Sequence, residues 1–199
     1  MLTACGGSGG GGDDEASLRA ELESIRSLHG LPALAAMRVE GDAVAEMAAV
    51  GSRAAGSPGK VTTRDQWHLG SLTKAMTATL AARLVERSLI TWDTTIKNVF
   101  PALPGMLSAY DNVRLDELLS HRSGLSDDIK TAAFLAASNS ADPLDTQRRD
   151  WIEILLAEAP AVSRGSYLYS NGGYIVAGAM LEAKSGKTWE DLLDEEVLT

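Results

Sequence analysis

The chain has 199 residues, 45% of them hydrophobic, and a formal net charge of −9. This length and composition suffice for one domain with a core, whereas the acidic balance and scattered basic residues argue against a nucleic-acid surface and against charge-driven binding to anionic lipid. No run approaches the roughly 18 apolar residues of a membrane-spanning helix.

The first 13 residues are predicted to form a disordered tether, because residues 6–12 are only Gly and Ser. The single cysteine, Cys5, follows Leu2-Thr3-Ala4, which has the shape of a bacterial lipoprotein cleavage site. The charged and apolar regions of a signal peptide do not precede it. Either the reading frame starts upstream, in which case a lipid on Cys5 attaches an exported protein to the membrane in the periplasm or cell envelope, or the match is chance.

Residues 14–199 are predicted to be the N-terminal part of one folded domain. Residues 15–28 predict an amphipathic helix, and residues 33–40 and 43–50 predict two strands joined at Gly41-Asp42, a two-residue hairpin turn. An isolated hairpin is marginally stable, and no segment after Val50 clearly pairs with its edge. This pattern indicates that further strands belong to the complete protein.

Helices follow in the rest of the chain. A short helix is expected from Asp93, as its N-cap, through Val99. Further helices are expected at residues 115–119, 147–157 and 172–184, the last ending at Gly186, and a final one begins near Thr188. Residues 126–144 predict a polar surface excursion.

The segment 67–74 (Trp-His-Leu-Gly-Ser-Leu-Thr-Lys) introduces the central helix. Its apolar residues lie at i, i+4 spacing and predict a helix inside the domain: Leu72, Met76, Leu80 and Leu84. Ser71 and Lys74 lie one turn apart, which places a nucleophile beside a base. The alternative is a serine N-cap with a surface lysine. A second match, residues 57–60, lies in a loop without an apolar helix and is discarded.

A second polar triplet, Tyr169-Ser170-Asn171, stands where an apolar helix begins. A tyrosine oxygen can shuttle protons beside a cation, and an asparagine amide can hold a substrate carbonyl. The alternative is a tyrosine packed at a turn. Residues 110–112 (Tyr-Asp-Asn) match the same pattern, but no Gly-Gly pair and apolar helix follow them, so this copy is treated as coincidence.

Three segments in order, residues 67–74, 118–125 and 169–174, resemble the penicillin-recognising serine hydrolases related to class C β-lactamases, D-alanyl-D-alanine carboxypeptidases and family VIII esterases. The resemblance covers about residues 30 to 199. It implies an α+β fold with a helical region packed on an antiparallel sheet, and no cofactor. Ser71 then resembles the nucleophile that forms an acyl-enzyme, Lys74 its proton-accepting partner and Tyr169 a second proton carrier. Asn171 resembles the residue that binds the substrate amide or positions Lys74.

The family's third motif, Lys/His-Thr/Ser-Gly on a late strand, is absent from the sequence. We therefore expect the C-terminal strands to be missing and these 199 residues to turn over little. The resemblance implies a small-molecule or peptidoglycan-type substrate: an ester, a D-Ala-D-Ala peptide or a β-lactam. The alternative is a non-catalytic penicillin-recognising module or a truncated pseudoenzyme. The three histidines (His29, His68, His121) are interpreted as structural, and their scatter indicates no metal site.

Overall fold

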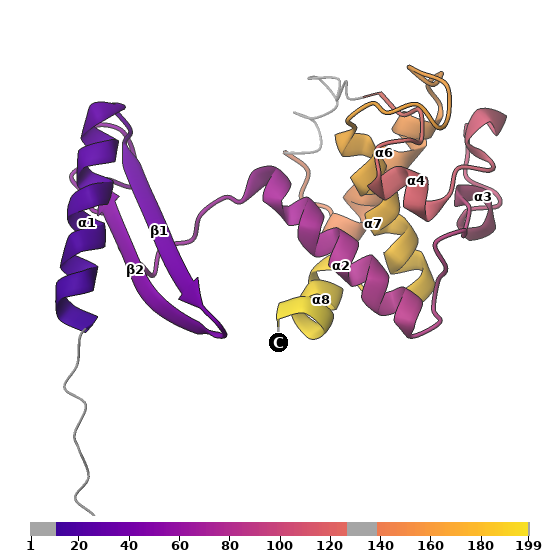
Figure 1. Cartoon of the computed structure of the whole chain (residues 1–199). Helices are drawn as coiled ribbons and strands as arrows, with labels where there is room; N and C mark the ends of the chain where they lie inside the picture. Colours follow the sequence, from indigo (N-terminus) through magenta and orange to yellow (C-terminus); the bar gives the residue numbers. More distant parts are fainter. Residues whose placement is uncertain (1–10, 127–138, 199) are drawn as a thin grey trace, which may run out of the picture. The chain divides into compact units, whose positions relative to one another are not determined.

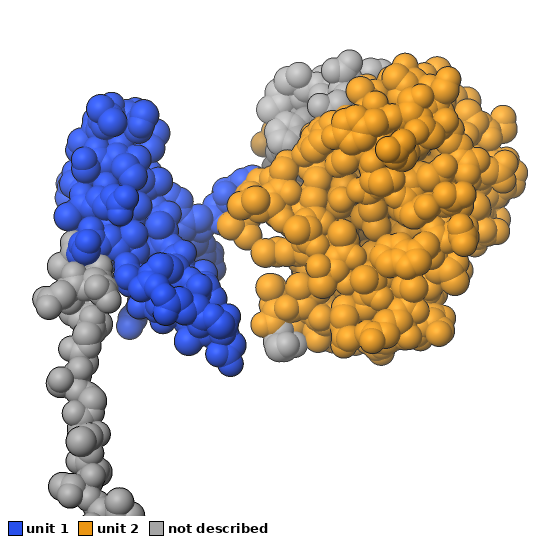
Figure 2. All heavy atoms as spheres, in the orientation of Figure 1, with its two compact units in different colours: residues 1–68 blue, residues 69–199 orange. Residues whose placement is uncertain are grey.

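The computed structural model describes residues 11–126 and 139–198, which form two compact units that divide between His68 and Leu69 (Figure 2). The first contains a strand pair, and the second contains helices (Figure 1). Within the described residues, no helix is both long and apolar enough to cross a bilayer. Cys5 lies outside them, so its lipidation stays a prediction.

The first unit is a β-hairpin with a helix on one face. Strand β1 (Ala33–Glu40) pairs antiparallel with β2 (Ala43–Gly51), and Ala33 pairs with Gly51. The turn places Gly41 at φ 63°, which glycine adopts without a steric penalty. Helix α1 (Gly11–Leu28) packs through a small apolar cluster: Leu18, Leu22, Leu34, Ala36, Ala48 and Val50. The predicted hairpin is therefore confirmed.

Helix α1 begins at Gly11, four residues before the predicted start at Glu15. Positions 11–13 of the predicted tether thus lie in a helix, and positions 1–10 lie outside the described residues. Glycine is a poor helix former, which is why the sequence suggested a later start. Once a helix is nucleated, each added residue gains a hydrogen bond, and this cooperativity extends α1 into the glycine run.

The second unit is built around α7 (Asn171–Ser185), whose middle is buried. The helices in contact with it are α2 (Thr73–Glu86), α3 (Ile96–Val99), α4 (Leu115–Leu119), α6 (Leu144–Leu156) and α8 (Trp189–Leu193). Short helical turns lie at Gly70–Leu72, Ser108–Tyr110 and Asp194–Leu198. The predicted helices therefore exist, with ends that move by a few residues.

Within the second unit, helix α2 is buried on one side, and the sequence predicted a helix inside the domain. Thr77, Leu80, Ala81 and Leu84 are buried, but Leu72 is 71% exposed. Helices α7 and α8 and the turn Asp194–Leu198 contact α2 within the described residues. Small residues on the other side, such as Ala75 and Ala82, are exposed. The neighbours of α2 within the second unit therefore cover one side of this helix.

Helix ends follow local capping chemistry. Gly186, at φ 74°, ends α7, and Thr188 Oγ1 accepts from the Asp191 N–H at the start of α8, as predicted. Helix α3 is capped by Thr95 instead of Asp93, because Thr95 Oγ1 accepts from Asn98 N–H and Asn98 Oδ1 accepts from Thr95 N–H. Most of the predicted excursion, residues 127–138, lies outside the described residues.

Candidate active site

Ser71 and Lys74 lie on consecutive turns at the start of α2. Ser71 belongs to the 3-10 turn Gly70–Leu72, so its hydroxyl does not cap the helix. Lys74 Nζ donates to Ser71 Oγ at 3.1 Å. Ser71 is exposed and Lys74 is half-buried, so the hydroxyl is accessible while the amine is partly enclosed. The predicted juxtaposition is present.

The beginning of α7 supplies two more polar groups. Tyr169 Oη lies 2.8 Å from Ser71 Oγ, and Asn171 Oδ1 accepts from Lys74 Nζ at 2.6 Å. Ser170, between them, caps α7 by accepting from Gly173 N–H at 3.1 Å. The cap points this side chain inward, and its two neighbours therefore face α2. The structure thus brings together all four predicted residues of the site.

Close packing fixes the start of α7. A Cβ on Gly172 would lie 3.2 Å from Leu155 Cδ2, and one on Gly173 would lie 3.1 Å from the Leu118 carbonyl oxygen. Both distances are tighter than ordinary van der Waals contact, so α6 and α4 approach the α7 backbone directly. The Gly-Gly pair therefore sets the depth at which Tyr169 and Asn171 enter the site.

Lys74 also faces two aromatic rings. Its Nζ lies 4.9 Å from the Tyr169 ring centroid and 5.5 Å from that of Tyr174, which are cation–π distances. Burial, and secondarily the Coulomb effect of Tyr169, raises the pKa of Tyr174. Tyr174 Oη donates to the Leu119 carbonyl at 2.8 Å. Tyr174 is thus an uncharged residue that lines the site beside Lys74. The oxygen of Tyr169, in contrast, contacts Ser71.

Comparisons with known proteins identify the family of this chain. Residues 18–199 match the family model described as Beta-lactamase. The chain belongs to the β-lactamase family. Penicillin-binding protein 4 of Amycolatopsis lactamdurans is 28% identical over 188 residues, which are 94% of this chain and 47% of that protein.

Solved structures show the same fold. A class C β-lactamase superposes with a TM-score of 0.71 at 22% identity, covering 93% of this chain and 49% of that one. D-alanine carboxypeptidase AmpC from Burkholderia cenocepacia gives a TM-score of 0.69 at 21% identity, covering 93% and 47%. This family member thus has the α+β fold of the serine β-lactamases and penicillin-binding proteins, and it spans about half the length of these relatives.

A cavity of about 260 Å³ adjoins Lys74 in this β-lactamase-family chain. Gly70, Lys74 and Asn171 line its site end, and Trp189 and Arg148 line another part. Arg148 bonds to Glu182 at 2.7 Å and to Glu190 at 2.8 Å. Two carboxylates thereby balance the charge of the arginine that lines this cavity.

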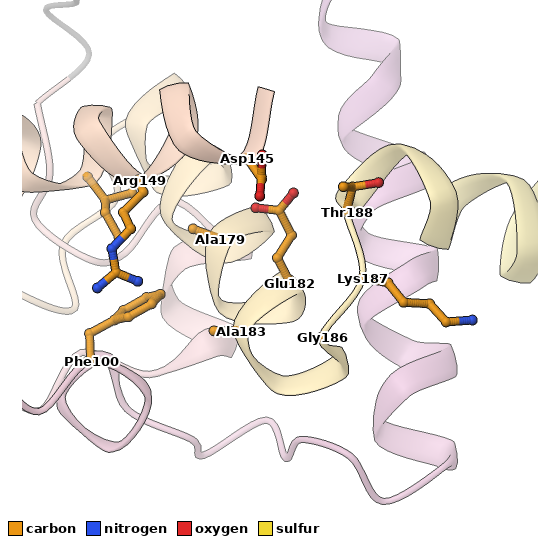
Figure 3. Close-up of a pocket in the computed structure, with 10 residues that line it drawn as sticks. Phe100, Asp145, Arg149, Ala179, Glu182, Ala183, Gly186, Lys187 and Thr188 are labelled. Carbon is orange, nitrogen blue, oxygen red and sulfur yellow. The ribbon is translucent and has the colours of Figure 1, made fainter. Parts of the chain in front are cut away.

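A second cavity, of about 300 Å³, lies among α6, α7 and the loop before α8 (Figure 3). Asp145, Arg149, Phe100, Glu182 and Lys187 are among its lining residues, and the four candidate site residues are not. Arg149 lies 5.9 Å from the Phe100 ring. This cavity is distinct from the Ser71 site.

Two aromatic residues of the site were missed by sequence reasoning. His121 was interpreted as a structural residue at a helix end, yet its ring stacks on Tyr169 with centroids 4.5 Å apart. Tyr174 was quoted in the family resemblance but received no role. It follows Asn171 by three residues, so helical spacing places the two on one side of α7, and this signal could have identified Tyr174.

Proposed function

We propose that this chain is the nucleophile-bearing part of a serine hydrolase that reacts through an acyl-enzyme. The observation that carries the proposal is the contact of one exposed hydroxyl, Ser71 Oγ, with Lys74 Nζ at 3.1 Å and Tyr169 Oη at 2.8 Å. A serine hydroxyl is a weak nucleophile until a neighbouring group accepts its proton. Two candidate acceptors are within hydrogen-bonding distance.

In the proposed acylation step, Ser71 Oγ attacks a substrate carbonyl while its proton passes to the Lys74–Tyr169 pair. A neutral Lys74 can accept it directly, or Tyr169 can accept it while the Lys74 cation stabilises the phenolate. The same pair then gives the proton to the leaving group. Related S-x-x-K enzymes share this uncertainty about the base. The Ser71 backbone N–H is proposed as one oxyanion donor.

Asn171 is proposed to position Lys74. Its side-chain oxygen accepts from Lys74 Nζ, which orients the amine between Asn171 and Ser71. The resemblance also allowed direct binding of the substrate amide. The short contact to Lys74 favours the positioning role as the first function of this side chain.

The proposed substrate is a compact acyl compound. A small ester or a D-Ala-D-Ala peptide is favoured over a β-lactam. A relative with the name penicillin-binding protein 4 supports a β-lactam-like substrate, and the ester and the D-Ala-D-Ala peptide rest on the family resemblance. The same site geometry serves all three substrate classes, because pocket shape decides among them. We further propose that residues 1–199 alone turn over little or nothing, since they contain no Lys/His-Thr/Ser-Gly motif on a late strand, which would supply the second oxyanion donor.

A covalent probe tests this proposal directly. The purified chain is treated with a fluorophosphonate, and the modified residue is mapped by mass spectrometry. We expect labelling of Ser71, its loss in Ser71→Ala, and unchanged labelling in Ser57→Ala, whose serine shares the Ser-x-x-Lys pattern. Failure to label Ser71 in folded protein would contradict the proposal and, if penicillin still binds in calorimetry, would favour a non-catalytic binding module.

We also propose export and attachment to the cell envelope through a lipid on Cys5. The Leu-Thr-Ala-Cys pattern before a glycine tract supports it. Expression from the native locus with radiolabelled palmitate should label the wild-type protein but not Cys5→Ala. Equal labelling of the two, or none, would contradict it.

A further inference from the structure

His121 has an unusual backbone conformation directly after α4. Its φ is 60°, in the left-handed region that L side chains rarely adopt. Such conformations persist where the surrounding contacts hold them, and they cluster at functional sites. At His121, the contacts that hold the backbone lie on both sides of Tyr169.

Three contacts of His121 bracket Tyr169. The backbone N–H of Leu168 donates to the His121 carbonyl at 2.9 Å, and the N–H of Ser170 donates to His121 Nδ1 at 3.1 Å. Between these two bonds, the imidazole stacks on the Tyr169 ring at 29°. The residue before Tyr169, the residue after it and its own ring are thus all held by one histidine.

The neighbouring loop segments reinforce this arrangement. Gly165 N–H donates to the Arg122 carbonyl at 2.8 Å, and Ala161 N–H donates to the Gly124 carbonyl at 2.9 Å. The segment 161–170 is thereby bonded along the segment 121–126. A shift of His121 would accordingly move Tyr169 relative to Ser71.

We propose that His121 is a positioning residue that aims Tyr169 Oη at Ser71 Oγ. It acts through its Nδ1, which accepts from Ser170 N–H, and through its ring, which stacks on Tyr169. This proposal rests on the function proposed above. Because Nδ1 accepts a hydrogen bond, the active form is the neutral imidazole with its proton on Nε2. Protonation of Nδ1 removes the acceptor that holds Ser170.

The groups around the His121 imidazole favour its neutral form. Tyr167 meets the imidazole edge-on at 6.0 Å, and Tyr174 lies 5.3 Å away and tilted. Lys74 Nζ lies close to the rings of Tyr169 and Tyr174, and Arg122 adjoins His121 in the chain, with its Nη1 donating to the Gly165 carbonyl. An imidazolium would place a positive charge on the ring that stacks on Tyr169, a ring that Lys74 Nζ also approaches. Protonation of His121 at low pH should therefore leave the position of Tyr169 Oη relative to Ser71 Oγ less well fixed.

Two variants separate the acceptor from the ring. His121→Asn keeps a side-chain oxygen that can accept from Ser170 N–H and tolerates positive φ, whereas His121→Phe keeps a ring and loses the acceptor. Misplacement of about 1 Å can cost about 10² in rate, so we expect His121→Phe to slow fluorophosphonate labelling of Ser71 by about 10 to 100-fold. His121→Asn should recover part of that loss.

A double-mutant cycle distinguishes positioning from general support of the fold. In a Tyr169→Phe background, His121→Phe should slow labelling far less than in wild type, because the hydroxyl that it aims is absent. On acidification from about pH 8 to pH 5, where imidazole titrates, wild type should lose rate relative to His121→Asn. Equal slowing in both backgrounds, or a pH-independent ratio, would overturn the proposal.

A measurement on the unreacted chain keeps this inference separate from the proposed function. In ¹⁵N imidazole spectra, His121 should show the Nε2–H form with Nδ1 as an acceptor. The Ser170 amide should exchange faster in His121→Phe, while the amides of Val176 and Met180 in the α7 core stay protected. A Ser71 that resists the probe would refute the function alone, whereas unchanged Ser170 exchange would refute the positioning role.

Discussion

Two segments share the pattern Ser-x-x-Lys, and only one presents its serine to other functional groups. In the loop of the first unit, Ser57 Oγ accepts from Gly59 N–H at 3.2 Å, and Lys60 forms a β-bridge with Ser52. In the second unit, Ser71 Oγ contacts an amine and a phenol. The difference lies in the two middle residues: Pro-Gly closes a turn on itself, whereas Leu-Thr continues into α2 and sets the serine and lysine one helical turn apart.

The two Tyr-x-Asn triplets repeat the lesson. Tyr110 is 1% exposed and donates to the Glu158 carbonyl at 3.0 Å, so it is a core residue. Burial raises the pKa of Tyr110 to about 12, with a further contribution from Glu158. Tyr169, at the start of α7, contacts Ser71 instead. The same three-residue pattern therefore places its tyrosine in the core in one case and beside Ser71 in the other, according to the segments packed around it.

The largest expected change in labelling rate comes from replacing the lysine in each of the two Ser-x-x-Lys sequences. Lys74→Met removes a proton acceptor and the bond to Asn171, so labelling of Ser71 by the probe should slow by about 10⁴, the upper end for proton-transfer catalysis. Lys60→Met should leave the rate unchanged. Labelling kinetics followed by in-gel fluorescence measure both, and a similar slowing in the two variants would show that the helical copy is not special.

The tyrosine comparison should give a smaller kinetic effect. Tyr169→Phe removes one of two groups that contact Ser71 Oγ, and labelling should slow by about 10². Tyr110→Phe should label normally but lose about 1 to 3 kcal/mol of unfolding free energy, because the Glu158 carbonyl loses its donor. Urea unfolding with parallel labelling separates the two. A slowed Tyr110→Phe would contradict the assignment of Tyr110 to the core.

A third prediction tests the loop pairing that holds Tyr169. Gly124 has φ 86°, and a Cβ there would lie 2.8 Å from the Val162 carbonyl oxygen. Gly165 has φ 90° with open space around it. Gly124→Ala should cost about 3 kcal/mol and Gly165→Ala about 1 kcal/mol of unfolding free energy. Thermal unfolding compares them, and equal losses would refute the steric explanation.

The smallest expected change in stability concerns the loop that contains the second Ser-x-x-Lys sequence, residues 57–60. A hydrogen bond from Arg53, and then one from Thr62 N–H, lowers the pKa of Asp65 from 3.8 to about 2. Because the folded pKa lies below the unfolded one, this stabilisation is complete above about pH 4 and is lost as the pH falls toward 2. Asp65→Asn should lower the urea midpoint at pH 6 and approach wild type only as the pH falls to about 2. The hairpin variant Asp42→Asn is the control, and a pH-independent difference would contradict the linkage.

Sequence reasoning predicted the hairpin, the helices of the second unit and the four polar residues of the site. Those features depend on local patterns, such as the Gly41-Asp42 turn and the spacing of Ser71 and Lys74. The side of α2 that its neighbours in the second unit cover and the stacking of His121 on Tyr169 depend instead on contacts between distant segments. Periodicity cannot show how much of a helix its neighbours cover, and no local pattern pairs residues 121 and 169.

The wide spacing of the site also governs when its chemistry can begin. Ser71 and Tyr169 are 98 positions apart, and Lys74 and Asn171 are 97 apart, so the contacts that activate the hydroxyl have high contact order and form late in folding. During synthesis from the N-terminus, Ser71 leaves the ribosome well before its phenol partner exists outside the exit tunnel. In the proposed mechanism, Ser71 of a nascent chain therefore lacks its phenol contact, and Lys74 lacks its amide contact, until α7 has docked against α2.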